Sequence, residues 1–378
     1  MRIAVVHSFY SSAQPSGENV AVESQIGWLR EAGHDVTLIA QRTDDREGRP
    51  LHRLRSAANV ASGRGPSPID ELTAFEPDVV HVHNTFPNWS THWIAGWRGP
   101  VVATAHNFRS VCASGTLYRE GRPCTECIDV TRWAGLSHSC YRGSRLATLP
   151  ISWRNRRGLQ QDPVLAAADA VIVLSESARR TFARAGLPPE RMFVIPNAVQ
   201  DPYGSGIHVR GQAGRWLYAG RLSPEKGLLE LLDRWPPDEV LDIVGTGPLA
   251  EAIHARTGDN VHYMGHVEHA SLLQAMPTYL GLVFPSRWLE HSPITVIEAL
   301  AAGLPLVALN GNMAADLVAQ HHVGAVVNSE DEWASALRTS RSAQEEHAEA
   351  ARRTYETYFT PAALVDALER CYAEVISS

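Results

Sequence analysis

Short apolar runs alternate with amphipathic stretches along the first half of the chain. The runs are rich in Val, Ile and Ala and have no polar face, so each predicts a strand buried on both sides. These predicted strands lie at 2–7, 34–40, 77–84, 100–107, 168–175 and 192–199. An amphipathic helix is predicted over 19–33, and a polar stretch rich in Arg, Gly and Pro predicts a loop as far as about Ile69. Strands that alternate with helices predict a parallel sheet covered on both faces.

The same alternation restarts near Gly214. Strands are predicted at 215–220, 240–245, 261–265, 281–286 and 304–309, with amphipathic stretches between them. Residues 197–214 lack periodicity and form a natural linker. The pattern therefore predicts an α/β fold with two Rossmann-like doubly wound domains, at 1–200 and 201–360. A final helix at 361–378 would pack on one of them, with the N-terminal domain as the candidate. Such sheets bind ligands at the carboxyl ends of their strands, so a central cleft between the domains is the expected active site.

Composition narrows the classes of function. The chain has 378 residues, 44% hydrophobic and 20% charged, as in globular proteins with sizeable cores. Its formal net charge of −7, from 34 basic and 41 acidic residues, argues against a nucleic-acid partner. The apolar run at the N-terminus is too short for a signal peptide, and no run reaches the roughly 20 residues of a membrane span. We therefore expect a cytoplasmic protein without stable disulfides.

The stretch 288–305 holds two glutamates with seven residues between them, Glu290 and Glu298. Ser292-Pro293 reads as a helix start, with Ser292 as the N-cap and Pro293 at the first helical position. The first turn, with Ile294 and Thr295, would then bind an anion through its N–H groups and the helix dipole.

Two cations are expected at the same edge of the sheet. Arg221 and Lys226 lie in a loop directly after another predicted strand. Together with a helix N-terminus they suit a diphosphate, whose charge must be held and must grow as a bond breaks. Glu298 is placed to accept hydrogen bonds from two ribose hydroxyls, and Glu290 to meet a sugar hydroxyl.

Several motifs in order resemble one enzyme family. The segments GRLSPEKG, IVGTGPL, VHYMGHV and EHSPITVIEALAAGLP look like the C-terminal motifs of the retaining glycosyltransferases of family four, which have the GT-B fold. Their E-x7-E signature is matched by Glu290 and Glu298. The segments HSFYSSAQPSGENV, DVVHVHNTFP, TAHNFRSVC and GRPCTECI resemble the N-terminal half of many bacterial members.

The resemblance implies further site residues. Gly17 would close onto the donor diphosphate, although a glycine there also serves a simple loop bend. Gly245 would shape a tight turn near the nucleotide. The base would stack near Gly265, His266 and Val267. The same turn matches the G-x-G-x-x-A dinucleotide pattern of dehydrogenases, but Pro248 and the lack of a following acidic strand end argue against that class.

In the first domain, His106 ends a predicted strand and by resemblance lies beside the donor sugar. A lone histidine at a strand end is otherwise usually structural. His83 and Asn84 end the neighbouring strand, and with Arg109 they are candidates for contacts with the acceptor. No carboxylate ends a strand in these motifs and no D-x-D motif is present, so we expect same-face transfer without a catalytic metal or other cofactor.

Four cysteines in the first domain have the spacing of a metal site. Cys112, Cys124, Cys127 and Cys140 give C-x11-C-x2-C-x12-C, which resembles a four-thiolate structural zinc site. Reduced free thiols and a redox pair are the alternatives. A following stretch rich in arginine, 141–158, predicts peripheral contact with anionic membrane, while a solvated face or a phosphate-binding patch remain open.

The sequence as a whole predicts a hexosyltransferase whose partners are a nucleoside-diphosphate sugar, UDP-linked by default and GDP-linked as the alternative, and an acceptor that is a saccharide or lipid-linked. A role in cell-surface polysaccharide or glycolipid synthesis is expected from the resemblance. The alternatives are a non-catalytic sugar-nucleotide-binding partner of another transferase and a GT-B sugar-nucleotide epimerase.

Overall fold

The computed structural model describes residues 1–10, 17–45, 51–204 and 214–377. The chain divides into two compact units. The first comprises Met1–Arg119, Cys124–Pro196 and Leu364–Ser378, and the second Glu120–Pro123 and Asn197–Ala363. The division after Pro196 falls four residues before the expected boundary at 200, and the C-terminal helix belongs to the first unit.

The first unit is built on a six-stranded parallel sheet, as the apolar runs predict. Its order is β2 (Asp35–Arg42), β1 (Arg2–Phe9), β3 (Val79–Val82), β4 (Val101–Ala105), β7 (Ala170–Val173) and β8 (Met192–Val194). Strands β3, β4 and β7 are buried at every position, which explains why their sequences have no polar face. The order reverses between β1 and β3, so the carboxyl ends of these strands form the switch point where such sheets bind ligands.

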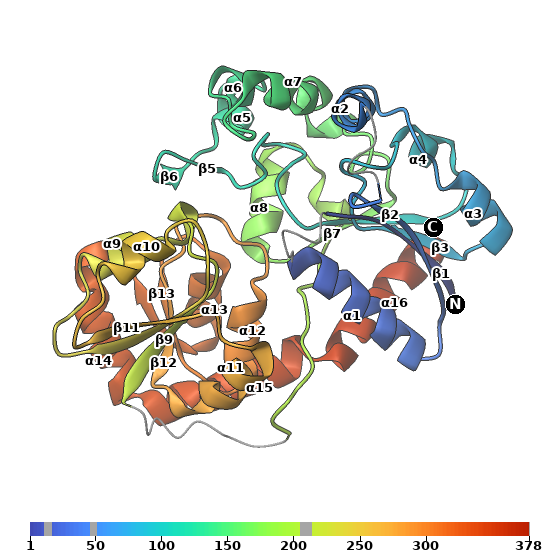
Figure 1. Cartoon of the computed structure of the whole chain (residues 1–378). Coiled ribbons are helices and arrows are strands. Elements are labelled where there is room, and N and C mark those ends of the chain that lie inside the picture. The colour runs from blue at the N-terminus through green and yellow to red at the C-terminus, as the bar shows by residue number, and fades with distance from the viewer. Residues whose placement is uncertain (11–16, 46–50, 205–213, 378) are drawn as a thin grey trace. The chain divides into compact units, whose positions relative to one another are not determined.

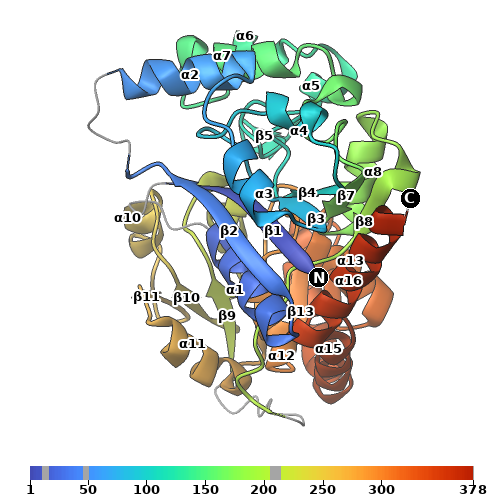
Figure 2. The same cartoon turned by 90° about the vertical axis from the view of Figure 1, so that its right-hand side faces the viewer.

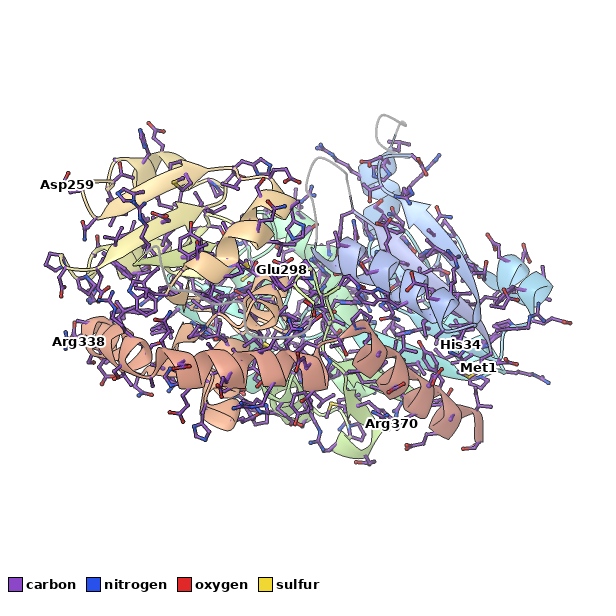
Figure 3. The ribbon with its side chains drawn as sticks, turned by 90° about the horizontal axis from the view of Figure 1, so that it is seen from below. Met1, His34, Asp259, Glu298, Arg338 and Arg370 are labelled. Atoms are coloured by element: carbon purple, nitrogen blue, oxygen red, sulfur yellow. The ribbon has the colours of Figure 1, made fainter. Side chains whose placement is uncertain are left out.

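Helices cover this sheet on both faces. They are α1 (Gly17–Glu31), α2 (His52–Ser62), α3 (Ile69–Phe75), α4 (His92–Gly96), α5 (Glu126–Asp129), α6 (Ala134–Ser137), α7 (Arg145–Asn155), α8 (Glu176–Arg184) and α16 (Pro361–Ser377), with 3-10 turns at Leu159–Gln161 and Pro189–Arg191. Helices α1 and α16 share one face, and Gln25 and Tyr372 both reach His81 of β3 from there (Figure 1). His34, directly before β2, bonds Glu369 of α16 at 2.7 Å, near Met1 and Arg370 (Figure 3).

One expectation for the first unit is wrong. The polar stretch as far as Ile69 was predicted to be a loop, but it contains helix α2, which packs against α7 (Figure 2). Its only fully buried side chain is Asn59, whose amide donates to the backbone of Pro87 and Trp89. A helix held by polar contacts has no apolar stripe, so the sequence shows no helical repeat of hydrophobic residues here.

The second unit has its own six-stranded parallel sheet. Its order is β11 (Val261–Gly265), β10 (Val240–Val244), β9 (Arg215–Ala219), β12 (Gly281–Phe284), β13 (Leu306–Leu309) and β14 (Gly324–Val327). In chain order this is 3-2-1-4-5-6, the Rossmann arrangement, with its switch point between β9 and β12. The sequence did not predict β14, which is short and only partly buried. A separate two-stranded ladder is formed by β5 (Tyr118–Arg119) and β6 (Arg122–Pro123).

Two apolar layers cover the second sheet. One contains helices α11 (His269–Ala275), α12 (Ile294–Ala301), α13 (Met313–His321) and α15 (Gln344–Tyr358). The other contains α9 (Leu228–Leu232), α10 (Ala250–His254) and α14 (Trp333–Ser342), with 3-10 turns at Pro224–Lys226, Met276–Thr278 and Glu330–Glu332 elsewhere in the unit. Six of the eight residues of α12 are buried, so this helix is fixed by packing along almost its whole length. No helix in the described ranges is long and apolar enough to cross a membrane.

Candidate functional site

The switch point of the second sheet brings together a lysine and a glutamate. Lys226 follows β9 and Glu290 follows β12, and the two strands are neighbours. Lys226 Nζ donates to Glu290 Oε1 at 2.7 Å, and their side chains are only 18% and 7% exposed. Ser286 Oγ donates to the same carboxylate oxygen at 2.7 Å. The Lys226 ammonium also lies 5.4 Å from the centre of the Trp288 ring. The site is therefore a buried, preorganised charge pair at the ligand-binding edge of the sheet.

Arg221 lies in the same loop but is much more exposed. Its guanidinium donates to Glu225 Oε1 at 2.8 Å and to Ser223 Oγ at 3.3 Å, while 68% of the side chain is exposed. Burial acts to raise the pKa of Glu225, but the hydrogen bonds from Ser223 and Arg221 prevail and the pKa is lowered. Arg221 is thus a cation held over the loop by an ionised carboxylate and still open to an anion.

The predicted start of α12 needs correction. The helix begins at Ile294 and its N-cap is Pro293, without a side-chain cap, so Ser292 is not the N-cap and Pro293 is not the first helical residue. The Ser292 hydroxyl accepts the N–H of Asn197 at 3.1 Å instead, and its carbonyl accepts the Asn197 side chain. The N–H groups of Ile294 and Thr295 still lie at the first turn, where no intrahelical acceptor is available to them. The helix end is therefore suited to an anion, one or two residues later than expected.

Glu298 lies on α12 (Figure 3) and is buried. Its Oε1 is 2.6 Å from Nε2 of His269, the first residue of α11. The sequence pattern found the carboxylate but gave no sign of its partner. The second glutamate of the motif is thus held by an exposed imidazole beside its helix.

Glycines let the loops at this edge pack tightly. Gly245 has a φ of +144°, and a Cβ there would lie 1.9 Å from the Gly220 carbonyl oxygen. Gly227, directly after Lys226, has a φ of +69°, and its Cβ would lie 2.2 Å from the Pro285 oxygen. Only glycine fits at either place. The packing of Gly245 therefore brings the ends of β9 and β10 together, and its place near the nucleotide stays a prediction.

The predicted base-binding segment follows β11. Gly265 ends that strand with a φ of +69° and accepts the Gly245 N–H at 2.8 Å. His266 comes next, and Val267 is partly buried against the core under α12. These residues thus lie at the same edge of the sheet as Lys226. Contact with a base stays a prediction.

In the first unit, the three predicted acceptor residues and His106, predicted beside the donor sugar, surround one pocket. His83, Asn84, His106 and Arg109 line it together with Asn107 and other residues. His83 Nδ1 and His106 Nε2 are 2.9 Å apart, and their rings stack with centroids 5.2 Å apart. The structure thus brings together His106 and the three candidates for acceptor contacts.

Asn84 and Arg109 have well-defined neighbours. Asn84 donates to the Tyr10 hydroxyl at 3.0 Å. The Arg109 guanidinium lies over the Phe86 ring at 4.3 Å, and its Nε and Nη1 are buried without a hydrogen-bond partner within the described ranges. A cation with spare donors at a pocket suits a polar or anionic ligand.

Sequence reasoning missed a carboxyl group beside this pocket. Glu18, in the first turn of α1, accepts from Asn107 at 3.4 Å. Burial raises its pKa to about 7, against the opposing charge of Arg109. The signal that could have found it is the acidic residue directly after Gly17 in the matched segment. Gly17 itself is the first residue of α1, a Cβ there would meet nothing within 4 Å, and the preceding residues 11–16 of the matched segment lie outside the described ranges.

The four predicted zinc ligands are free thiols: Cys112, Cys124, Cys127 and Cys140. Burial raises the pKa of Cys127 and Cys140 to about 11, and the neighbouring cysteines act in the same direction. Within the described ranges no three His, Cys, Asp or Glu side chains form a group that could hold a metal ion. Zinc binds thiolates, so these thiols would have to lose protons as the metal binds. The zinc ion stays a prediction.

Comparison with known proteins gives a consistent result. Residues 15–201 match the family described as Glycosyltransferase Family 4, and residues 210–357 match the family described as Glycosyl transferases group 1. Together the two matches cover most of both units.

Two bacterial relatives have the same name. A phosphatidyl-myo-inositol mannosyltransferase of Mycobacterium tuberculosis is 33% identical over 128 residues, which are 30% of this chain and 34% of the relative. The match thus covers about a third of that relative's length. The phosphatidyl-myo-inositol mannosyltransferase of Propionibacterium freudenreichii subsp. shermanii is 26% identical over 352 residues, 82% of this chain and 77% of the relative.

A solved structure shares the fold. Anabaena Alr3699/HepE, crystallised with UDP and glucose, has a TM-score of 0.64 at 17% identity, and the likeness covers 99% of this chain and 100% of that one. At this identity the likeness is evidence for the two-domain α/β architecture alone.

Proposed function

This chain belongs to the glycosyltransferases of family four, with the GT-B fold, and we propose that it moves a hexose from a nucleoside-diphosphate sugar to an acceptor hydroxyl with retention at the anomeric carbon. The observation that carries the proposal is the Lys226–Glu290 pair at the switch point of the second sheet. An ammonium held in place before the ligand arrives loses little freedom when it meets a diphosphate.

The proposed chemistry needs no nucleophile from the protein. The bond between the anomeric carbon and the diphosphate oxygen breaks, and the acceptor oxygen bonds to that carbon on the same face. The leaving oxygen takes the acceptor's proton. Lys226, Arg221 and the first-turn N–H groups of α12 stabilise the charge that grows on the diphosphate. Loss of one such donor typically reduces turnover by about 10²–10³.

The other site residues have proposed roles in holding the donor. Glu298 accepts hydrogen bonds from the ribose hydroxyls, and Glu290, besides fixing Lys226, meets a hydroxyl of the sugar. The segment from Gly265 to Val267 lies against the base. His106 contacts the sugar, and Arg109 offers its unpaired N–H groups to the acceptor. Catalysis uses no metal or other cofactor.

The donor and acceptor follow from chemistry shared with relatives. We propose a UDP-linked hexose, since the Anabaena protein of the same fold holds UDP and glucose. GDP-mannose is the alternative, since both relatives are named as mannosyltransferases. Their names also include a phosphatidyl lipid, which favours a glycolipid or a lipid-linked saccharide as the acceptor.

A thermal-shift screen tests the donor. UDP-glucose, UDP-galactose, GDP-mannose and a dTDP-hexose are added to the purified chain, because a ligand bound only by the native state raises its stability. The expected result is a shift with one nucleotide and none with the others. The anomeric configuration of the product, read by NMR, then tests retention. A chain that binds a sugar nucleotide but neither transfers nor hydrolyses the sugar is a non-catalytic partner, and one that inverts a sugar stereocentre is an epimerase.

We also propose that the first unit docks on anionic membrane through helices α2 and α7. Leu146, Leu149 and Trp153 recur at helical spacing on α7 and are 85%, 43% and 45% exposed, although a water-facing row is normally polar. The packed helix α2 adds Leu54, which is 66% exposed, and the two helices lie side by side (Figure 2).

Arginines surround this apolar row. The Arg156 guanidinium lies over the Trp153 ring at 3.9 Å, and Arg142, Arg145 and Arg157 lie close by in the sequence. Apolar side chains flanked by arginine match the boundary between acyl chains and anionic headgroups. Flotation with vesicles containing phosphatidylglycerol is the test. Docking is supported if the wild-type protein floats with the anionic vesicles, while the Leu146→Glu/Leu149→Glu variant does not and the wild type does not float with neutral vesicles. Equal recovery of protein with the vesicles in all three experiments contradicts docking.

A further inference from the structure

Three imidazoles stack in the first unit, two of them buried and one partly buried, and the proposed transfer gives a role to His106 alone. His81 and His83 stack with ring centroids 4.0 Å apart, and His83 and His106 with centroids 5.2 Å apart. His81 and His83 are 0% and 5% exposed. Every polar atom buried this deeply needs a hydrogen-bond partner, so the partners decide which ring nitrogens are protonated.

Gln25 of α1 decides the tautomer of His83. Its side-chain Nε2 lies 3.2 Å from His83 Nε2 and 3.3 Å from His81 Nδ1. An amide NH2 group only donates, so both ring nitrogens must accept. Burial lowers the pKa of His81 to about 3 and that of His83 well below its usual value, so both rings are neutral. A neutral imidazole has one N–H, which places it on Nδ1 of His83 and on Nε2 of His81.

The other contacts of His81 are compatible with this tautomer. Its Nε2 lies 2.7 Å from Thr104 Oγ1, which can accept the N–H there. The Tyr372 hydroxyl lies 2.7 Å from His81 Nδ1 and can donate to it. Burial raises the pKa of Tyr372 well above its usual value, so the phenol keeps its proton. Both contacts agree with the tautomer that Gln25 requires.

His83 passes the constraint on to His106. With its proton on Nδ1, His83 donates to His106 Nε2, 2.9 Å away. His106 therefore accepts at Nε2, and in its neutral form its own proton is on Nδ1. We propose that Gln25 is a positioning residue for glycosyl transfer: through His83 it holds His106 in one tautomer and one orientation beside a hydroxyl of the bound sugar. This role rests on the proposed function, whereas the tautomer itself does not.

The assignment has a chemical consequence. With Nε2 occupied by the His83 N–H, His106 can take up a proton only if that hydrogen bond breaks. His106 then orients the sugar and does not act as a general base. This agrees with a reaction in which the leaving diphosphate takes the acceptor's proton, because a fixed imidazole holds the sugar without competing for that proton.

NMR of the wild-type protein tests the tautomers without any substrate. Histidine labelled with ¹⁵N in both ring positions is incorporated, and long-range ¹H–¹⁵N spectra at pH 7.5 distinguish the two neutral forms. His83→Gln and His106→Gln assign the signals. The expected result is protonated Nδ1 in His83 and His106 and protonated Nε2 in His81. Protonated Nε2 in His83 means that the Gln25 amide is reversed, and the proposal fails.

The isosteric variant Gln25→Glu tests the role. An ionised carboxylate accepts where the amide donated, so the protons of His83 and His106 move to Nε2. Transfer from the donor that the thermal-shift screen selects then falls by about tenfold in kcat, the effect of one lost hydrogen bond to the sugar. UDP carries no hexose and makes no contact with His106 through one, so the Gln25→Glu protein should bind UDP as tightly as the wild type does.

Tyr372→Phe is the matched control, because it removes a buried donor to His81 and leaves the path from Gln25 to His106 intact. Its His83 and His106 tautomers should match the wild type. A Gln25→Glu protein with inverted tautomers and unchanged kcat overturns the positioning role. A wild-type protein that transfers no sugar but shows the expected tautomers instead overturns the proposed function, and so separates the two failures.

Discussion

Replacing Lys226 by methionine removes the ammonium but keeps most of the side-chain volume. The Glu290 carboxylate, 7% exposed, then loses its 2.7 Å partner and keeps the Ser286 hydroxyl on the same oxygen. A buried carboxylate without its cation is costly, because neither water nor another charge compensates it. Lys226→Met should therefore weaken both the fold of the second unit and its hold on a diphosphate.

The magnitude follows from the burial of the pair. Removing one partner of a buried ion pair costs about 3–5 kcal/mol. Because Glu290 keeps one hydrogen bond and Lys226 is 18% exposed, we expect a cost just below this range, about 2–3 kcal/mol. For a domain of this size, each kcal/mol lowers the Tm by about 2–4 °C, so the expected loss is about 4–12 °C. One charge-assisted hydrogen bond contributes about 1.5–3 kcal/mol, so the Kd for UDP should rise about tenfold to a hundredfold.

Calorimetry and titration with UDP measure the two effects. Arg353→Met is the matched control, since Arg353 pairs with Glu349 at 3.3 Å on the surface with side chains 65% and 45% exposed. An exposed i,i+4 pair on a helix contributes about 0.3–0.5 kcal/mol, so this variant should keep its Tm within about 2 °C and bind UDP normally. Adding Glu290→Gln to Lys226→Met should restore part of the Tm but not the affinity. A Lys226→Met protein with wild-type Tm and wild-type Kd refutes the reasoning.

Three further predictions come from other parts of the chain. Gly245→Ala places a Cβ 1.9 Å from the Gly220 oxygen and should cost about 3 kcal/mol by denaturant unfolding, whereas Gly258→Ala, with nothing within 4 Å, should stay within about 0.5 kcal/mol; equal costs contradict the packing argument. Burial lowers the pKa of His7 from 6.5 to about 4, so the native state binds fewer protons than the unfolded one, and stability falls as the pH drops from 6.5 to 4, by about 3 kcal/mol from this group. His7→Gln should therefore reduce the loss of stability between pH 6.5 and 4. An unchanged slope in this range would mean that other groups cause the loss. Elemental analysis of protein purified without chelator should find one zinc per chain, lost in Cys124→Ser/Cys127→Ser, and wild-type protein without metal ends the zinc prediction.

The strands of both sheets could be predicted because their signal is local. A strand covered on both faces is buried at every position and mostly apolar, as β3, β4 and β12 are, and a chain of such runs specifies a parallel sheet. The site residues after β9 and β12 were found for the same reason, since a parallel sheet brings its strand ends to one edge. Helix α2 was missed because a single buried asparagine leaves no apolar stripe.

The partners of the site residues could not be predicted. Lys226 and Glu290 are 64 positions apart, and His269 and Glu298 are 29 apart, so their pairing depends on the packing of separate elements. Gln25 shows the same limit, because its contact with His83 spans 58 positions and needs α1 to lie on the correct face of β3. The N-cap of α12 was predicted wrongly because the Ser292 hydroxyl accepts a hydrogen bond from the backbone of Asn197, which is 95 positions away.

A crystal structure of the chain with UDP tests the central claim most directly. The account predicts that the diphosphate lies at the carboxyl ends of β9 and β12, with a phosphate oxygen within hydrogen-bonding distance of Lys226 and of the first N–H groups of α12. Clear density for UDP at any other place, with the Lys226–Glu290 pair untouched, contradicts it.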